Sequence, residues 1–355
     1  MIDRSFWQDK TVFITGHTGF KGGWLSLWLQ TLGANVVGYS LQPLTKPNLF
    51  SLARVDSGMT SLIGNVNDFA QLSQAMMTHQ PDIVMHLAAQ PLVPHSYLEP
   101  LLTYTTNVMG TLHVLEAVRR VSRVKAVINV TTDKCYENLE SARGYQETDR
   151  LGGHDPYSNS KACAELVTDA YRRSYFNADK GRVGVATVRA GNVIGGGDWA
   201  DTRLVPDVIH SCLSAEPITL RYPEAIRPWQ HVLEPLSGYL LLAEKLYAKP
   251  HDFSDAWNFG PAVSDAKTVR WMVDSISALW GVPLTIKASN DASLLHETQT
   301  LYLDCAKGKA ALQWSPRWDI EQALQATVSW YKACHAARDM RDFTLAQIED
   351  FGKSG

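Results

Sequence analysis

The fold is decided first by the stretch Val12-Phe13-Ile14-Thr15-Gly16-His17-Thr18-Gly19-Phe20-Lys21-Gly22. Its apolar start predicts a strand, and its three glycines predict a turn. Apolar residues then recur at helical spacing from Trp24 to Leu32, and Gly33 ends that pattern. A second apolar run, from Val36 to Tyr39, predicts the next strand. Strand, turn, helix and strand in this order indicate a βαβ unit at the start of the chain.

The three glycines of the turn are expected to have separate roles. Gly16 permits the tight turn, Gly19 lets the backbone approach a pyrophosphate, and Gly22 lets the helix pack closely on the strand. The N–H groups at the start of the helix then face the anionic phosphates. A glycine-rich turn that binds nothing is the alternative, but a strand before it and a helix after it favour a dinucleotide site.

Other residues of the same turn, His17, Phe20 and Lys21, are further candidates for cofactor contacts. Lys21 would place an ammonium beside the phosphates, and His17 could donate a hydrogen bond there. The alternative for Lys21 is a solvated side chain on the first helical turn. In that position its charge would oppose the helix dipole, so the phosphate contact is favoured.

The composition is that of a globular protein with a sizeable core. The chain has 355 residues, of which 45% are hydrophobic and 19% charged, and its net charge is −3. This charge gives no basic field for nucleic acid, and no apolar run is long enough to span a membrane. The five cysteines are scattered without the spacing of metal ligands, which indicates reduced thiols in a cytoplasmic protein. We therefore expect no metal, no nucleic-acid partner and no membrane segment.

Strand and helix patterns alternate along most of the chain. Further strands are predicted at residues 60–64, 83–89, 124–131, 184–189 and 256–259, and helices at residues 67–79, 97–121, 155–176 and 235–247. This alternation predicts an α/β fold with a doubly wound, Rossmann-type parallel sheet. The pattern beyond residue 189 predicts a smaller, mostly helical substrate-binding domain. We expect residues 1–189 and 229–260 to form the dinucleotide-binding domain, and residues 190–228 and 261–355 the substrate domain.

Two of the predicted helices, at residues 97–121 and 155–176, are rich in small and apolar residues. One sheet contact needs fewer apolar residues than these helices carry. One of their faces is therefore expected to dock a second subunit, in a homodimer or a homotetramer.

A candidate catalytic group is divided between two predicted elements. Thr132 and Asp133 follow a predicted strand, and Tyr157 and Lys161 lie four residues apart on the next helix, which places them on one helix face. An ammonium near a phenol favours the phenolate and lowers the pKa of the tyrosine from about 10 toward neutrality. Such a tyrosine can remove a proton from a sugar hydroxyl while Thr132 holds the substrate oxygen in line.

The order of these motifs resembles that of the extended short-chain dehydrogenases. A tyrosine and a lysine at this spacing are common on helix surfaces, but here they follow the glycine turn, the run His86-Leu87-Ala88-Ala89, Asn107 and Thr132. The resemblance covers the chain nearly end to end. It implies the family's fold, dependence on NAD or NADP, and cofactor contacts at the glycine turn, Leu87, Ala88, Ala89, Asn107, Tyr157 and Lys161.

The residues after Thr132 distinguish the branches of that family. In sugar-nucleotide 4,6-dehydratases an Asp-Glu pair follows, in which the Asp protonates the departing C6 hydroxyl and the Glu removes the C5 proton. Here the pair is Asp133-Lys134, which with the glycine loop resembles the branch that acts on CDP-glucose. Lys134 can be the C5 base only if burial or neighbouring cations lower its pKa. Otherwise it makes an electrostatic or cofactor contact, and the C5 base is unassigned.

The same resemblance implies substrate contacts in the second half of the chain. Asn192 is expected beside the sugar or the diphosphate. Arg227, in the segment Arg-Pro-Trp-Gln-His-Val, fits an arginine that clamps the diphosphate, since a guanidinium suits phosphate well. Arg203 is a second candidate for this clamp, and a surface arginine is its alternative.

The implied reaction is an internal redox cycle. Tyr157 and NAD oxidise C4 of the glucose ring, water is lost across C5–C6 with Asp133 as the acid, and the cofactor returns its hydride to C6. The product would be CDP-4-keto-6-deoxyglucose, a precursor of deoxysugars in surface polysaccharides. NAD is favoured by the family alone, because the second strand ends in Tyr39-Ser40-Leu41 without the usual acid for the ribose diol. No arginine follows at once to hold a 2′-phosphate either.

Two alternatives remain open at this point. An epimerase, or a dehydratase for another nucleotide sugar, would share most of these motifs, although Asp133 argues against an epimerase. A non-catalytic regulator that binds NAD(P) would share the fold. Such a regulator could lose Thr132, Tyr157 or Lys161 without consequence, and all three are present.

Overall fold

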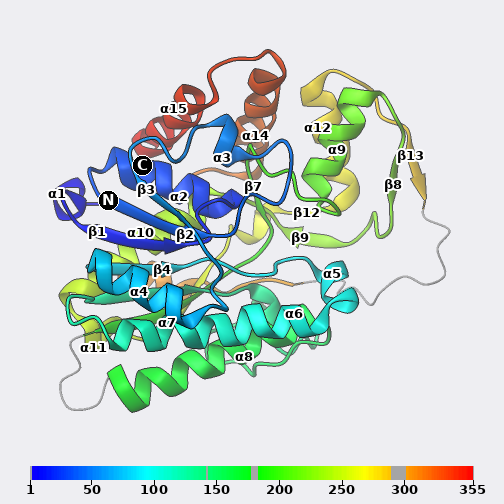
Figure 1. The fold of residues 1–355 in the computed structure, drawn as a ribbon. Coiled ribbons are helices and arrows are strands. Elements are labelled where there is room, and N and C mark those ends of the chain that lie inside the picture. The colour runs from blue at the N-terminus through cyan, green and yellow to red at the C-terminus, as the bar shows by residue number, and fades with distance from the viewer. Residues whose placement is uncertain (1, 141–142, 177–182, 289–300, 355) are drawn as a thin grey trace.

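The centre of the molecule is a sheet of seven parallel strands in the order β11-β6-β5-β4-β1-β2-β3 (Figure 1). The computed structural model describes residues 2–140, 143–176, 183–288 and 301–354. The strands are β1 (Thr11–Thr15), β2 (Asn35–Ser40), β3 (Thr60–Ile63), β4 (Ile83–His86), β5 (Ala126–Val130), β6 (Gly184–Ala190) and β11 (Ala256–Phe259). The strand order reverses direction at β1, so the predicted doubly wound α/β fold is confirmed.

Helices cover both faces of the sheet, as a parallel sheet requires. One apolar core lies under α2 (Phe20–Thr31), α10 (Leu233–Ala248), α14 (Ile320–His335) and α15 (Met340–Lys353). The opposite core lies under α4 (Phe69–His79), α7 (Gly110–Arg119) and α8 (Pro156–Tyr171). The short helices are α1 (Arg4–Trp7), α3 (Leu49–Leu52), α5 (Val93–Leu98), α6 (Pro100–Tyr104), α11 (Pro250–Phe253) and α13 (Ala306–Leu312). Among the described residues, no helix combines the length and the apolar character needed to cross a membrane.

Two predicted elements differ from the structure. The helix expected over residues 97–121 is instead the series α5, α6, a π-helical turn (Thr105–Met109) and α7. The break falls at Glu99, whose φ and ψ are −128° and 64°, because the following Pro100 disfavours a helical residue before it. The strand expected to reach residue 89 ends at His86. The Leu87 N–H is shared between the Thr15 carbonyl, at 3.1 Å, and the Thr15 hydroxyl, at 3.2 Å, and the Ala88 N–H donates to that hydroxyl at 3.2 Å.

The remaining elements lie beyond the carboxyl ends of the strands. They are α9 (Leu204–Ser214), α12 (Val269–Trp280) and the short ladders β7 (Val193–Ile194) with β10 (Gln230–His231), β8 (Ile218–Leu220) with β13 (Ile286–Ala288), and β9 (Ile226–Pro228) with β12 (Ala266–Thr268). The helices α14 and α15, which the sequence places with them, also pack on the sheet side. Phe351 of α15 meets the Trp28 ring of α2 edge-on, at 5.7 Å between centroids. The domain boundaries stay a prediction, and one continuous apolar core joins the two parts.

The turn between β1 and α2 depends on close backbone approach. A Cβ at Gly22 would lie 2.1 Å from the Gly16 carbonyl oxygen, so only glycine fits there. Gly16 has a φ of +83°, and a Cβ on it would lie 2.8 Å from the Ala88 nitrogen. The His17 ring packs behind the turn, where a Cβ at Gly38 of β2 would lie 2.3 Å from it. Glycine in the middle of β2 is therefore explained by the buried histidine that covers it.

Replacing Gly38 by alanine should destabilise the protein through this contact. The added methyl overlaps the His17 ring, and overpacking of this kind costs about 1–3 kcal/mol. The additional change His17→Ala removes the ring and should recover much of the loss in the double variant, since the two residues touch. Chemical denaturation measures both effects.

Gly352→Ala is the matched control, because a Cβ there meets nothing within 4 Å and the residue lies inside α15. It should leave the midpoint of unfolding unchanged or raise it slightly. A Gly38→Ala protein as stable as its parent would contradict the packing described.

Candidate active site

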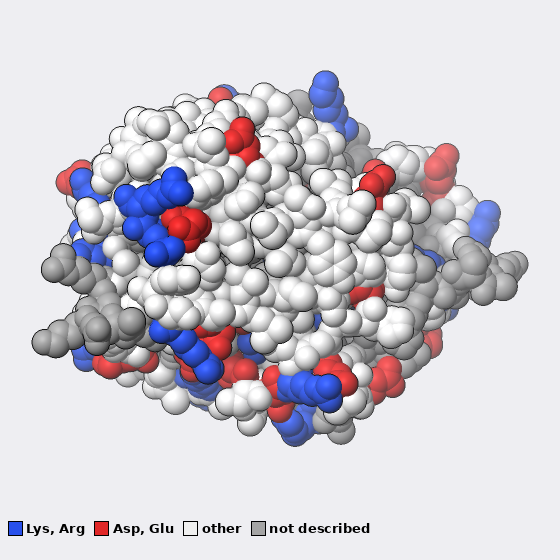
Figure 2. Space-filling view, turned by 60° about the horizontal axis from the view of Figure 1, so that its bottom comes forward, with Lys and Arg blue, Asp and Glu red and all other residues white. Residues whose placement is uncertain are grey.

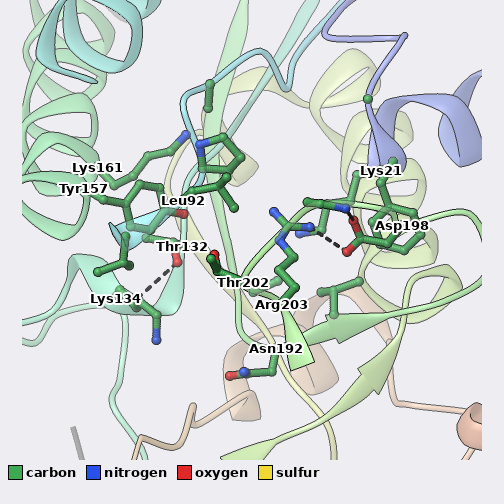
Figure 3. Close-up of a pocket in the computed structure, with 18 of the residues that line it drawn as sticks. Lys21, Leu92, Thr132, Lys134, Tyr157, Lys161, Asn192, Asp198, Thr202 and Arg203 are labelled. Carbon is green, nitrogen blue, oxygen red and sulfur yellow. Dashed lines mark hydrogen bonds and ion pairs between the residues drawn. The ribbon is translucent and has the colours of Figure 1, made fainter. Parts of the chain in front are cut away.

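One cavity of about 1030 Å³ lies at the carboxyl ends of the strands. Its walls come from the β1–α2 turn, the segments after β4 and β5, one face of α8, and residues 190–207 and 218–229 (Figure 3). The carboxyl ends of parallel strands are the usual place for ligands in such a fold. This volume lies at the upper end of the usual range for ligand pockets, so the cavity suits a large ligand.

Nearly all of the residues singled out in the sequence line this cavity. They are Gly16, Gly19, Phe20, Lys21, Gly22, Leu87, Ala88, Ala89, Thr132, Asp133, Lys134, Tyr157, Lys161, Asn192, Arg203 and Arg227. Residues that are about 200 positions apart in the chain therefore line the same cavity.

His17 and Asn107 lie elsewhere than expected. The His17 ring is fully buried, and its Nε2 is 2.7 Å from the Ser61 hydroxyl, so the side chain points away from the cavity. Burial lowers the pKa of His17 to about 4, which leaves the ring neutral. The Asn107 amide accepts from the N–H of Gln90 at 2.9 Å and donates to Ser160 at 2.9 Å. Asn107 thus ties the segment after β4 to α8 and supports the cavity from behind.

The β1–α2 turn has the shape and the chemistry for a dinucleotide. Gly19 is the N-cap of α2 and has no side chain to cover the first helical N–H groups, so these face the cavity. A Cβ at Gly16 would fill the space against Ala88. The Thr18 hydroxyl of this turn lies 2.8 Å from the hydroxyl of Ser40, the last residue of β2, and donates to the Leu41 carbonyl. The cradle therefore fits a pyrophosphate. Hydroxyl groups occupy the end of β2, where the sequence lacks the acid that usually binds the ribose diol.

Helix α8 places the tyrosine and the lysine. Asp155 is its N-cap and accepts from the N–H of Ser158 at 2.9 Å, so the helix starts just before Tyr157. Tyr157 and Lys161 are 8% and 6% exposed and lie one turn apart. The Lys161 ammonium donates to the Val130 carbonyl at 3.0 Å, at the end of β5. Helix and strand end are thereby locked together beside the reacting groups.

The electrostatics of this pair differ from the expectation. Burial raises the pKa of Tyr157 to about 12, against the lowering effect of a hydrogen bond with Thr132 and of the Arg203 charge. The phenol is therefore neutral in the protein as described. Burial also lowers the pKa of Lys161 to about 8, although the Glu165 carboxylate opposes this change. The sequence predicts that Lys161 lowers the pKa of Tyr157. In the structure this pKa is raised instead, because the loss of solvent around the buried phenol outweighs the nearby charges.

The acid candidate lies next to the threonine. Asp133 is 2% exposed and accepts from the Thr132 hydroxyl at 3.1 Å through one oxygen. Its other oxygen has no hydrogen-bond partner within the described part of the chain and lies against Gly191, where a Cβ would be 2.5 Å away. The backbone N–H of Lys134 donates to the Thr132 hydroxyl at 3.3 Å. The Lys134 side chain points away from Lys161 and Tyr157 (Figure 3).

Two arginines and a third lysine also belong to the lining. Arg203 points into the middle of the cavity and pairs with Asp198 at 2.7 Å (Figure 3). Tyr331 of α14 donates to the Asp198 carbonyl at 2.5 Å, which fixes this loop. Arg227 is 3% exposed and donates to the Ile226 carbonyl at 2.8 Å. Burial, with the nearby Arg203, lowers the pKa of Lys21 to about 8, and its ammonium lies 5.9 Å from the Tyr239 ring centroid.

Two acids that pair with arginines in or near the site, Glu165 and Asp198, were not identified from the sequence. Glu165 continues the helical spacing of Tyr157 and Lys161 by one more turn, and this spacing is the signal that could have found it. Asp198 has no such signal, because it follows three glycines in a loop and meets Arg203 only in the folded chain.

Comparison with known proteins identifies the family. The family model for GDP-mannose 4,6 dehydratase matches residues 13–327. The chain is 50% identical to CDP-glucose 4,6-dehydratase of Salmonella typhimurium, over 99% of this chain and 98% of that protein. It is 28% identical to dTDP-glucose 4,6-dehydratase of Xanthomonas campestris, over 90% of this chain and 93% of that protein.

Solved structures show the same fold at lower identity. The crystal structure of dTDP-glucose 4,6-dehydratase from Bacillus anthracis, in complex with NAD, superposes with a TM-score of 0.77 at 23% identity and covers 93% of this chain and 98% of its own. DesIV, a dTDP-glucose 4,6-dehydratase from Streptomyces venezuelae, gives a TM-score of 0.79 at 22% identity and covers 93% of this chain and 99% of its own. The sheet order, the glycine turn and these matches agree, and the chain belongs to the GDP-mannose 4,6 dehydratase family, within the extended short-chain dehydrogenases.

Proposed function

We propose that this protein is an NAD-dependent lyase that converts CDP-glucose to CDP-4-dehydro-6-deoxyglucose and water. The observation that carries the proposal is Asp133, a buried acid with one unpaired oxygen, in one cavity with Thr132, Tyr157 and Lys161. An epimerase needs no such acid. The choice of CDP-glucose rests on the 50% identity to CDP-glucose 4,6-dehydratase of Salmonella typhimurium. The product would supply deoxysugar biosynthesis, including that of O-antigens.

The oxidation half of the reaction is assigned to Tyr157, Thr132 and Lys161. Tyr157 must act here as its phenolate, a form that the positive charges of Lys161 and of the bound nicotinamide favour. The phenolate takes the proton of the C4 hydroxyl, and Thr132 holds that oxygen in line. Lys161 fixes the helix to β5 and keeps a positive charge beside the cofactor site. The chemistry supplied by bound NAD is acceptance of hydride from C4 and its return to C6. The residues that would hold it are those of the glycine cradle, with Phe20, Lys21, Leu87, Ala88 and Ala89 on the walls.

The elimination half is assigned to Asp133. Hydroxide is a poor leaving group, so the C6–O bond breaks only if a proton arrives as it does so. Asp133 is buried next to Thr132 and is therefore positioned to deliver that proton. Lys134 lines the same space and remains a candidate for the C5 base, with an electrostatic contact as the alternative role.

Substrate binding is assigned to Asn192, Arg203 and Arg227. All three line the cavity, and two of them are guanidinium groups, which suit a diphosphate. Arg203 is paired with Asp198 in the cavity and its side chain is 34% exposed, which supports its role as a ligand. We assign the protein to the cytoplasm, because its five cysteines are free thiols.

We also propose that the protein forms a homodimer through the face over α6 and α8, with a homotetramer as the larger assembly. Figure 2 shows a broad central area of this face without Lys, Arg, Asp or Glu. Its exposed apolar side chains include Leu98, Leu101 and Leu166, which are 77%, 83% and 58% exposed. A second copy of the same face would cover them symmetrically.

Tyr157→Phe should abolish turnover while leaving the fold and cofactor binding intact. The ring is retained and the proton acceptor is lost, so product formation from CDP-glucose should fall by about a hundredfold or more. The alkali-induced absorbance of the 4-keto sugar measures this. Tyr171→Phe, on the same helix but outside the cavity, is the control and should keep the parent rate. Near-normal turnover by Tyr157→Phe would remove this residue from the mechanism.

Asp133→Asn should separate oxidation from elimination. The amide can still accept the Thr132 hydrogen bond, but it cannot deliver a proton at a useful rate. With CDP-glucose present, we expect the near-ultraviolet absorbance of reduced cofactor to build up on the enzyme, with little 4-keto-6-deoxy product. Asp169→Asn is a control on α8, outside the cavity, and should behave as the parent. Product release at the parent rate without this absorbance would show that the proton comes from another group.

Leu101→Lys combined with Leu166→Lys should break the homodimer. Each change buries a charge in the proposed interface without a partner, which is strongly unfavourable. Sedimentation should therefore shift from dimer or tetramer mass to that of a smaller species. Val263→Lys, at another exposed apolar position, is the control and should not change the mass. A monomeric parent protein, or an unchanged mass in the double variant, would overturn this interface.

A further inference from the structure

Helix α8 carries a third buried polar residue in line with its two catalytic candidates. Tyr157, Lys161 and Glu165 follow one another at intervals of four, so they form one stripe on the helix. Glu165 is 3% exposed and does not line the cavity. A carboxylate so deeply buried is costly unless it is paired and hydrogen-bonded, and no step assigned above uses it.

The Glu165 carboxylate accepts four hydrogen bonds, from two residues of β6 and from Thr131, which follows β5. Arg189 of β6 donates to both of its oxygens, at 2.9 and 2.8 Å, in a bidentate ion pair that is 3% exposed on each side. The Thr187 hydroxyl donates at 2.6 Å, and the Thr131 hydroxyl donates in a short hydrogen bond. Although burial alone would raise the pKa of Glu165, Arg189 holds it below its usual value, so the carboxylate is ionised. Glu165 therefore fixes α8 against the ends of β5 and β6.

The same ion pair reaches the segment that holds the acid Asp133. Arg189 donates to the Tyr136 hydroxyl at 2.8 Å, and its guanidinium lies 4.8 Å from the Tyr136 ring centroid. Tyr136 directly follows the 3₁₀ turn Asp133–Cys135. Thr131, which donates to Glu165, directly precedes Thr132. One buried carboxylate thus connects the helix of Tyr157 with both sides of the Asp133 segment.

The Glu165 charge also acts on Lys161. Burial lowers the pKa of Lys161 to about 8, and Glu165 is the main group that opposes this. Among the described residues, Cys135 and His86 also interact electrostatically with Lys161, and neither supplies a negative charge at neutral pH. Burial raises the pKa of the Cys135 thiol far above its usual value and lowers the pKa of His86 to about 3, so both are neutral. Lys21, on the opposite wall, is itself a cation whose pKa Lys161 lowers.

We propose that Glu165 is a positioning residue: it keeps Lys161 charged and holds α8, with Tyr157, in register with the segment of Thr132 and Asp133. This inference deepens the proposed dehydratase function and rests on it. Glu165 does not touch the cavity, so its effect passes through Lys161, Thr131 and Arg189. A merely structural glutamate would stabilise the fold without changing the titration of Lys161.

The test compares Glu165→Gln and Glu165→Asp with the control Glu234→Gln. Glu234 is also fully buried and accepts backbone N–H bonds from Arg317 and Trp318, but it lies outside the cavity. The first measurement is the titration of the Lys161 ammonium, followed by NMR of labelled lysine and assigned with Lys161→Met. The second is the rate of product formation from CDP-glucose at about pH 9 relative to about pH 6.5.

In Glu165→Gln the titration midpoint of Lys161 should fall by about one pH unit, because the charged form loses its neighbouring anion. Lysine is charged below its pKa, so the variant loses the ammonium at a lower pH than the parent. The ratio of the two rates should then fall by about sevenfold for a shift of this size. Glu165→Asp keeps the negative charge, so its Lys161 midpoint should lie close to that of the parent protein. Glu234→Gln should leave the Lys161 midpoint unchanged.

If Glu165→Gln does not fold, because Arg189 is left buried without its partner, the double variant Glu165→Gln/Arg189→Gln removes both charges and keeps the test open. An unchanged Lys161 midpoint, or an unchanged rate ratio, in the variant that folds would overturn the proposal. The lysine titration needs no turnover. If the parent protein makes no product from CDP-glucose, the dehydratase function fails, and the effect of Glu165 on Lys161 is still measured separately.

Discussion

The burial of ionised side chains around one cavity is the constraint on which the rest of the site depends. Lys161, Arg189 and Glu165 are each less than 7% exposed. Ions removed from water must be paired or hydrogen-bonded, or they lose their charge. The bidentate pair of Glu165 with Arg189 meets this requirement fully. Lys161 meets it only in part, so its pKa lies near 8, where small changes in its surroundings alter its charge.

The parallel sheet explains how distant residues come to share this environment. The carboxyl ends of β1, β4, β5 and β6 meet at one edge, and each is followed directly by residues of the cavity wall. Close contact between the β1–α2 turn and Ala88 is possible only because Gly16 lacks a side chain. Thr132 and Asp133 leave β5 beside the helix that follows, so the groups for proton removal and proton delivery lie on neighbouring elements.

The C-terminal helices contribute to the cavity although they are far from it in sequence. Tyr331 of α14 holds the Asp198 carbonyl, and the Asp198 carboxylate holds Arg203. The Trp330 ring packs where a Cβ at Gly196 would lie 2.0 Å away, so that glycine loop closes tightly on the helix. The cation in the middle of the cavity is therefore positioned by packing against the last third of the chain. The continuous apolar core agrees with this dependence between the two parts.

The sequence by itself determined the features that depend on local spacing. The glycine turn, the alternation of strands and helices, the shared face of Tyr157 and Lys161, and the place of Asp133 after a strand all follow from neighbouring residues. The tertiary structure alone decided where His17 and Asn107 point, because Gly38 and Gln90 reach them only after folding. It also decided the charge states. The pKa of Tyr157 rises to about 12 because burial outweighs its partners, and burial is a property of the packed chain that no local spacing reveals.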